Sequence, residues 1–381
     1  TTPGGIWNCW GRSGVCTLVD VVYIAAIATI STGMGLTLLR RLGPICESRA
    51  EELVFSLGFG LGTLALAVQA LGFAHLLYVE VFYGLLALGA LVGSRELVGL
   101  SGRLEGYLGV IRLQWRSLHF WLLVLVGANL LLNLLRALLP AHGAVDPLAY
   151  HLALPKLYLL RHHLDFERTL TGALYPDNVG MLYLLAIGLR DASLAQVVHW
   201  FMGAATVVAI WCFCRRYFTS RVGAWAAVVF SFTPVFVFFA PLSYVDIGVG
   251  LFQFLGLWAL YKWTREGGHR ALMLTAVFMG LAMGSKHTGL FVAIAGAVVV
   301  AGWGLYRRES YARVMQSVAL YGAIAVGLAA PWYLRALWEA GNPVWPVANG
   351  LFGGLPYKGG YSISAGVIAA DSVRFVDRVQ D

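Results

Sequence analysis

An acid, a phenol, an imidazole and an amine crowd together in one short stretch that follows a long apolar run. The stretch holds Asp146, Tyr150, His151 and Lys156, with Pro147 directly after the acid. A carboxylate at the mouth of a membrane cavity can act as a general base if it reaches the proton of an acceptor group. The alternative is structural, because Asp is a good helix N-cap and Pro suits the first turn. The two interpretations are compatible, since a capping position would hold the acid rigidly.

A second acid and a lysine stand at two later breaks between apolar runs. Asp246 ends the stretch Ser-Tyr-Val-Asp, and Lys286 lies within Gly-Ser-Lys-His-Thr-Gly. An ionisable residue beside a bilayer is a functional candidate by default. A lysine near a helix N-terminus could also hold a phosphate. The structural alternatives are a helix cap for Asp246 and, for Lys286, a side chain that snorkels to the lipid headgroups.

An arginine and several aromatic residues follow the last long apolar run. Arg335 ends the stretch Pro-Trp-Tyr-Leu-Arg, and Gly-Asn-Pro-Val-Trp-Pro at 341–346 predicts a fixed turn. Arg335 could pair with a lipid-linked phosphate, whereas the tryptophans could be no more than an interfacial belt. Asp146 and His151 could contribute to a site for a divalent metal, although their spacing matches no known zinc motif.

The composition sets the class of protein that must position these residues. The 381 residues are 59% hydrophobic and 12% charged, whereas about 25% of residues are charged in soluble domains. Apolar runs near the ~20 residues of a crossing helix predict an all-α, polytopic transmembrane bundle of about ten spans. The expected spans are about 18–39, 52–73, 75–92, 118–139, 194–214, 222–240, 247–263, 271–283, 288–305 and 313–330. The formal charge of +8 comes from short basic clusters between these runs, so nucleic acid is not an expected partner.

The loop charges predict which residues share a face of the membrane. Basic clusters such as 40–41, 215–216 and 307–308 fall in alternate loops, and the positive-inside rule places these loops in the cytoplasm. The extracytoplasmic face would then hold the 140–193 loop and the candidates Asp146, Asp246, Lys286 and Arg335. Within that loop, residues 146–164 and 179–189 predict helices that lie at the membrane interface.

Two glycine-rich patches, at 58–62 and 280–284, lie inside apolar runs. Neither follows a predicted strand, and the spacing from Gly280 to Lys286 is not that of a phosphate-binding loop. We therefore expect these glycines to permit close packing between helices.

Taken together, these residues resemble the bacterial membrane glycosyltransferases of the GT-C superfamily. The similarity is to the lipid-carrier-dependent group related to protein O-mannosyltransferases and the lipid A aminoarabinose transferase. It rests on the stretches 146–156, 244–246, 280–289, 331–335 and 341–346, and it covers about residues 118–350. It implies a core at 118–350, preceded by three spans in 1–117 and followed by an extracytoplasmic segment at 351–381. Because the family has further spans after this point, the chain is expected to be C-terminally short.

The resemblance also implies an activity, a location and roles for the candidate residues. The activity would be inverting transfer of a sugar from a polyprenyl-phosphate carrier to an extracytoplasmic acceptor, in the bacterial inner membrane. Asp146 would be the base and Asp246 the second catalytic acid. The substrate-binding residues would be Tyr150, His151, Lys156, Lys286 and Arg335, of which the last two would hold the donor phosphate. The expected partners are the lipid-linked sugar donor and membrane lipids.

Two other functions fit parts of the sequence. A degenerate, non-catalytic copy of such an enzyme could serve as a structural subunit beside other membrane subunits of a larger complex, and the expected short C-terminus favours this alternative. A secondary transporter would place ionisable groups near the bilayer midplane. Here the charged candidates gather at one interface, which disfavours transport.

Overall fold

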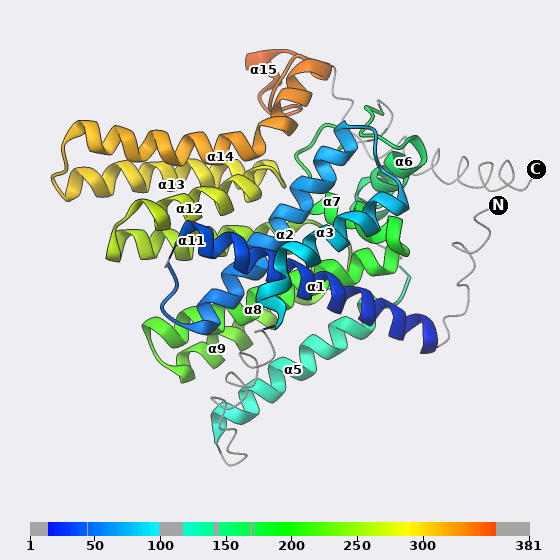
Figure 1. Cartoon of the computed structure of the whole chain (residues 1–381), viewed down its shortest axis with the longest axis horizontal. Helices are drawn as coiled ribbons and strands as arrows, with labels where there is room; N and C mark the ends of the chain where they lie inside the picture. Colours follow the sequence, from blue (N-terminus) through cyan, green and yellow to red (C-terminus); the bar gives the residue numbers. More distant parts are fainter. Residues whose placement is uncertain are drawn as a thin grey trace, which may run out of the picture.

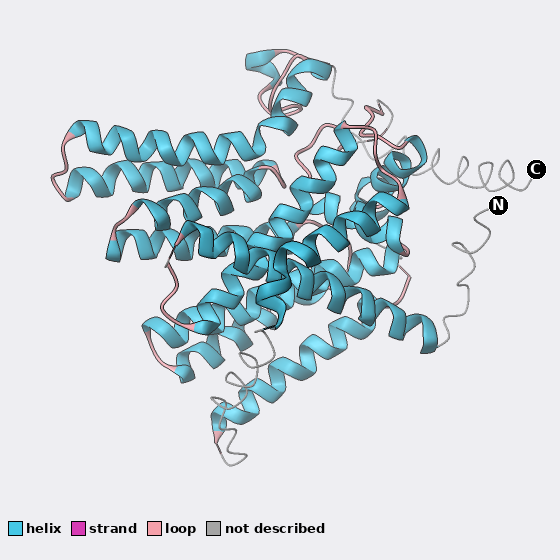
Figure 2. Ribbon diagram, viewed as in Figure 1, coloured by secondary structure: helices cyan, strands magenta, loops and turns pink. Residues whose placement is uncertain are grey.

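Every element of the described chain is helical, which confirms the predicted all-α class (Figure 2). The computed structural model describes residues 14–43, 45–98, 117–140, 145–167, 170 and 172–355. Within these ranges, seven helices are long and apolar enough to cross a membrane. They are α1 (Gly14–Leu42), α2 (Arg49–Phe73), α3 (Val79–Val98), α5 (Leu118–Ala137), α8 (Ala192–Tyr217), α13 (His287–Tyr306) and α14 (Tyr311–Ala340).

The other three expected spans differ from these seven, so the number of about ten is not confirmed. The run 222–240 forms two helices, α9 (Ser220–Ser231) and α10 (Pro234–Phe239), because the Thr233 hydroxyl caps a new helix at Phe236 N and a proline occupies its first turn. Helix α11 (Asp246–Glu266) is long enough but carries more charge. Helix α12 (His269–Met283) is apolar and has only 15 residues.

The 140–193 loop forms short helices close to the two predicted ranges, and the first range is divided into two elements. A π-helical turn, η1 (Pro147–His151), leads into α6 (Ala153–Arg161), which ends at the left-handed residue His162. Next, α7 (Asn178–Leu189) is buried at every position except Gly188 and packs against α2, α6 and α8. The predicted interfacial position of α7 is wrong, because a helix that is apolar on all sides must be covered on all sides.

Figure 1 shows α11 to α14 stacked side by side, with α1 to α3 crossing the middle of the molecule and α5 along one edge. The connections between α8 and α9, α11 and α12, and α13 and α14 lie at the left of this view, whereas α6 and α7 lie at the right. The basic connections therefore gather at one end of the bundle. This arrangement agrees with the shared face that the loop charges predict.

The glycine-rich patches sit where helices approach most closely. A Cβ added at Gly60 of α2 would lie 1.8 Å from the carbonyl oxygen of Ser31 in α1, so these two helices are in close contact here. A Cβ added at Gly280 of α12 would lie 2.7 Å from the carbonyl oxygen of Ala325 in α14, so these helices are also in close contact. These contacts confirm the predicted role in helix packing.

A cluster of charges is buried at the end of α11 that is remote from Asp246. The Lys262 ammonium lies 2.9 Å from the Glu51 carboxylate, 3.2 Å from Glu266 and 3.7 Å from Glu47. The Lys262 and Glu51 side chains are 0% and 1% exposed. Arg216 also pairs with Glu47, so the cluster joins α2, α8 and α11.

Candidate functional site

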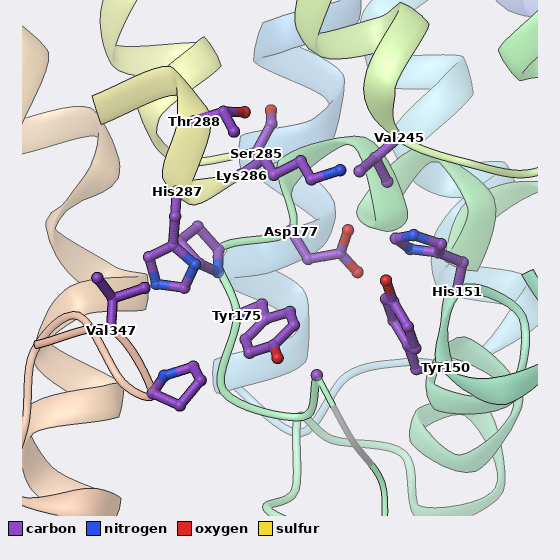
Figure 3. A pocket seen from close by; sticks show the side chains of 13 residues that line it. Tyr150, His151, Tyr175, Asp177, Val245, Ser285, Lys286, His287, Thr288 and Val347 are labelled. Atoms are coloured by element: carbon purple, nitrogen blue, oxygen red, sulfur yellow. The ribbon is translucent and has the colours of Figure 1, made fainter. Parts of the chain in front are cut away.

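A cavity of about 220 Å³ lies where several of the charged loops meet (Figure 3). Five stretches that are distant in the sequence line it: η1, the loop before α7, the residue before α11, the α12–α13 junction and the turn after α14. The lining includes Tyr150, His151, Asp177, Lys286 and His287. Two of the predicted candidates, Asp146 and Asp246, are each one hydrogen bond from a lining side chain.

Asp146 is linked to the cavity wall through Tyr150. The Tyr150 hydroxyl donates to Asp146 Oδ2 at 3.0 Å, because residues four apart lie on the same face of this helical turn. Asp146 makes no side-chain capping hydrogen bond to η1, although Pro147 does occupy the first turn. The observed contact of the acid is therefore with a cavity residue rather than with the helix terminus.

His151 presents an imidazole without a hydrogen-bond partner to the cavity. The residue is 5% exposed, and neither ring nitrogen has a hydrogen-bond partner among the residues that the structure describes. Burial lowers the pKa of His151 to about 3, with smaller contributions from Lys286 and His199, so the ring is neutral at pH 7. A neutral imidazole carries one donor and one acceptor. Buried polar groups are normally hydrogen-bonded, so an imidazole with two unsatisfied nitrogens in the cavity lining is a candidate to bind a ligand.

Asp246 and Lys286 form an ion pair at the opposite wall. Lys286 Nζ donates to Asp246 Oδ1 at 2.7 Å. The Lys286 side chain is 33% exposed and the Asp246 side chain is 40% exposed. Neither side chain caps the helix that it precedes or begins. The loop before Asp246 is held in place by α7, because the Tyr183 hydroxyl donates to the carbonyl of Tyr244. The pair is therefore positioned by neighbouring helices and remains open to water and ligands.

Two predicted binding residues do not line the cavity. Arg335 is buried within α14, where Nη2 donates to the carbonyl of Asp165 at 2.7 Å and the guanidinium lies over the Tyr158 ring. Lys156 lies on α6, where burial lowers its pKa and Asp191 partly opposes that effect. Neither side chain belongs to the wall as it stands.

The main residue that the sequence analysis missed is Asp177. Its carboxylate accepts a hydrogen bond from Gly180 N at 3.0 Å and caps α7, while its side chain lines the cavity. Burial raises the pKa of Asp177 to about 8, although the Gly180 N–H and Arg335 act in the opposite direction. An Asp directly before an apolar helix is an N-cap signal that could have singled it out.

A metal site is not assembled by the described side chains. In the described ranges there is no group of three or more His, Cys, Asp or Glu residues that could hold a metal ion. Asp146 and His151 therefore do not complete a ligand set there, and a divalent metal stays a prediction.

The comparison with protein families adds independent information on the second half of this site. Residues 181–352 match the family model described as dolichyl-phosphate-mannose-protein mannosyltransferase. This match confirms the resemblance to GT-C membrane glycosyltransferases. No curated protein and no solved structure matched the chain. The matched segment contains Asp246, Lys286 and Arg335, and it begins after Asp146 and Asp177.

The match and the seven apolar helices of the described part support a multi-pass membrane glycosyltransferase of the GT-C type. The family description names a sugar donor in which a phosphate joins the sugar to a long isoprenoid lipid. Such a donor requires a site that a lipid headgroup can reach and that holds a phosphate beside a group able to accept a proton. The cavity contains candidates for both tasks.

Proposed function

We propose that the protein transfers a sugar from a polyprenyl-phosphate carrier to an extracytoplasmic acceptor, with Asp146 as the base. The cavity would face the extracytoplasmic side of the bacterial inner membrane. One observation carries this proposal: an acid–phenol pair, a neutral imidazole and an ammonium–carboxylate pair converge on one small cavity from three distant parts of the chain. The basic connections at the other end of the bundle support the orientation.

The proposed reaction is a single displacement at the anomeric carbon of the donor. The acceptor oxygen attacks this carbon while Asp146 takes the acceptor's proton. The bond between the anomeric carbon and the phosphate oxygen breaks, and its electron pair leaves with the polyprenyl phosphate. Attack from the face opposite the leaving group inverts the configuration.

Lys286 is the group best placed to stabilise the leaving phosphate. Its ammonium faces the cavity and is already oriented by Asp246. Both side chains are partly exposed, and ion pairs of this kind contribute only about 0–1 kcal/mol. A donor phosphate can therefore share or replace the Asp246 contact at small cost. Asp246 then serves to hold the ammonium in position for the charge that develops on the phosphate.

The proposal is tested by Asp146→Asn in membrane vesicles from the native host. The vesicles are supplied with polyprenyl-phosphate mannose, and transfer of the labelled sugar to endogenous acceptors is measured. We expect transfer to fall by about 10²–10⁴-fold, because Asn cannot accept the proton. The matched control is Asp165→Asn, which removes a carboxylate from the same loop that instead pairs with Arg161.

Wild-type transfer by Asp146→Asn vesicles, with Asp165→Asn also unaffected, would exclude Asp146 as the base. Absence of sugar transfer by the wild-type protein, with unchanged surface glycans and an intact membrane complex after Asp146→Asn, would favour the structural-subunit alternative.

A further inference from the structure

We propose that Asp177 binds the sugar donor as a neutral carboxylic acid that donates a hydrogen bond into the cavity. This inference rests on the proposed function and assigns its two buried-site acids opposite tasks. Asp146 would accept a proton during the reaction, whereas Asp177 would keep its own proton throughout.

The Asp177 carboxyl is held rigidly at the start of α7. Gly180 N donates to Oδ1 at 3.0 Å, and a Cβ added at Gly180 would lie 1.9 Å from Oδ2, so only glycine leaves room for the carboxyl. Figure 3 shows the carboxyl directed toward Tyr150 and His151 across the cavity. The group therefore faces the same space as the predicted substrate-binding residues.

No cation in the described ranges forms an ion pair with Asp177. Arg335 of α14 is the nearest cationic influence, but its guanidinium is engaged by the carbonyl of Asp165 and the ring of Tyr158. Lys286, at the α12–α13 junction, is paired with Asp246. Among the described residues, the charge that an ionised Asp177 would carry thus has no ion-pair partner.

The remaining titratable groups that face Asp177 add no positive charge. Within the described ranges they are the phenols of Tyr150, Tyr158, Tyr175 and Tyr183 and the imidazoles of His151 and His287. His151 is neutral for the reason given above. Enclosure by these groups disfavours the carboxylate, and burial raises the pKa of Asp177 to about 8 against the opposing influence of Gly180 N–H and Arg335.

A protonated Asp177 suits an anionic donor. A phosphodiester brings a negative charge into a cavity whose lining residues Lys286 and Tyr150 are hydrogen-bonded to the carboxylates of Asp246 and Asp146. An ionised Asp177 would repel it at short range, whereas the neutral acid has an O–H that can donate to a phosphate or sugar oxygen. Donor affinity should therefore depend on the protonated fraction of Asp177.

The first test measures the KM for polyprenyl-phosphate mannose between pH 7 and pH 9 in vesicles. In the wild type, we expect KM to rise about tenfold by pH 9, because the binding-competent fraction falls to about one tenth. Asp177→Asn retains a hydrogen-bond donor and a good N-cap. Its KM should become independent of pH over this range, whatever its absolute value.

The second test does not depend on transfer. The ordinary pKa of 3.8 is raised to about 8 in the folded protein, so folding takes up a proton between these values. The stability contributed by Asp177 therefore falls as the pH rises through this window. The apparent Tm of Asp177→Asn in detergent should rise relative to the wild type from pH 4 to pH 8. The control is Asp191→Asn at the N-cap of α8, where no such growing difference is expected.

Parallel Tm profiles for the wild type and Asp177→Asn would show that Asp177 is ionised and would overturn the inference. A KM that still rises with pH in Asp177→Asn would also overturn it, while leaving sugar transfer established. By contrast, no transfer from the lipid-linked sugar by the wild type would overturn the proposed function itself, together with the donor-binding role.

Discussion

Helix α11 connects two lysine–carboxylate clusters that differ in burial and in what they can bind. Asp246, its first residue, pairs with Lys286 beside the cavity. Lys262 lies 16 positions further along (262 − 246), about 24 Å away at 1.5 Å per residue, among three carboxylates. Lys262 is wholly buried, whereas one third of the Lys286 side chain is exposed.

The difference in burial separates Lys262, whose charge is structural, from Lys286, whose charge is available to a ligand. The Lys262 ammonium pairs with carboxylates from the segment before α2, the start of α2 and the end of α11. It therefore links α2 to α11 and leaves no room for a ligand. The Lys286 ammonium has one carboxylate in the described chain and a cavity on its other side. Burial with several partners identifies a structural lysine, and partial exposure with one partner identifies a candidate for phosphate binding.

The largest expected effect is that of Lys262→Met on stability. It would leave the Glu51 carboxylate buried without its cation. Breaking a buried pair in this way lowers the free energy of unfolding by about 3–5 kcal/mol. Chemical denaturation in detergent micelles measures this change. A loss below about 1 kcal/mol, the value expected of exposed pairs, would remove the distinction between the two lysines.

The double variant Lys262→Met with Glu51→Gln is the control for this prediction. It removes both charges, so most of the lost stability should return. A double variant as unstable as Lys262→Met alone would show that lost packing, rather than the uncompensated carboxylate, causes the effect.

Lys286→Met should lower the rate of sugar transfer and leave the free energy of unfolding almost unchanged. Its effect on the activation free energy should be smaller than the stability effect of Lys262→Met. Loss of one preorganised donor at a developing charge lowers the rate by about 10²–10³-fold, or ~2.7–4 kcal/mol. Sugar transfer from polyprenyl-phosphate mannose measures this loss. The free energy of unfolding should change by less than about 1 kcal/mol, because Asp246 remains partly exposed to water. A stability loss as large as that of Lys262→Met would place Lys286 among the structural charges.

The smallest effect is expected for Arg161→Gln, which provides the baseline for both lysines. Arg161 pairs with Asp165 and Glu167 at the surface of the same loop as the cavity residues. Exposed pairs contribute about 0–1 kcal/mol, so stability and transfer should both stay near wild-type values. A tenfold loss of transfer would show that the loop surface, and not only the cavity wall, takes part in the reaction.

The sequence was sufficient to predict most helices and to single out three of the thirteen residues that line the cavity. Apolar runs reveal helix positions directly, and breaks between them drew attention to Tyr150, His151 and Lys286. Arg335 was expected after the end of the last span, but its helix continues through Pro331. The residue therefore lies within α14, where its side chain is buried. Helix length alone cannot reveal such an extension, since a proline normally predicts a boundary.

Asp177 was missed for a different physical reason. Its importance depends on α7 being buried, and a short apolar run such as 179–189 is equally consistent with an interfacial helix and with a core helix. Only the packing of α2, α6 and α8 around α7 decides between them. That packing involves residues on both sides of α7 in the sequence, and a local pattern contains no information about it.

The burial of α7 also has a consequence for the order of assembly in the membrane. This helix is covered by α2, which precedes it in the chain, and by α8, which follows it. Independently stable spans insert first and associate afterwards, so α7 can reach its final position only after α8 has been synthesised and inserted. Because Asp177 stands at the first turn of α7 and the Tyr183 hydroxyl holds Tyr244, the cavity forms late in biogenesis. A nascent chain that ends before α8 would therefore contain Asp146 and Asp177 but not a formed cavity.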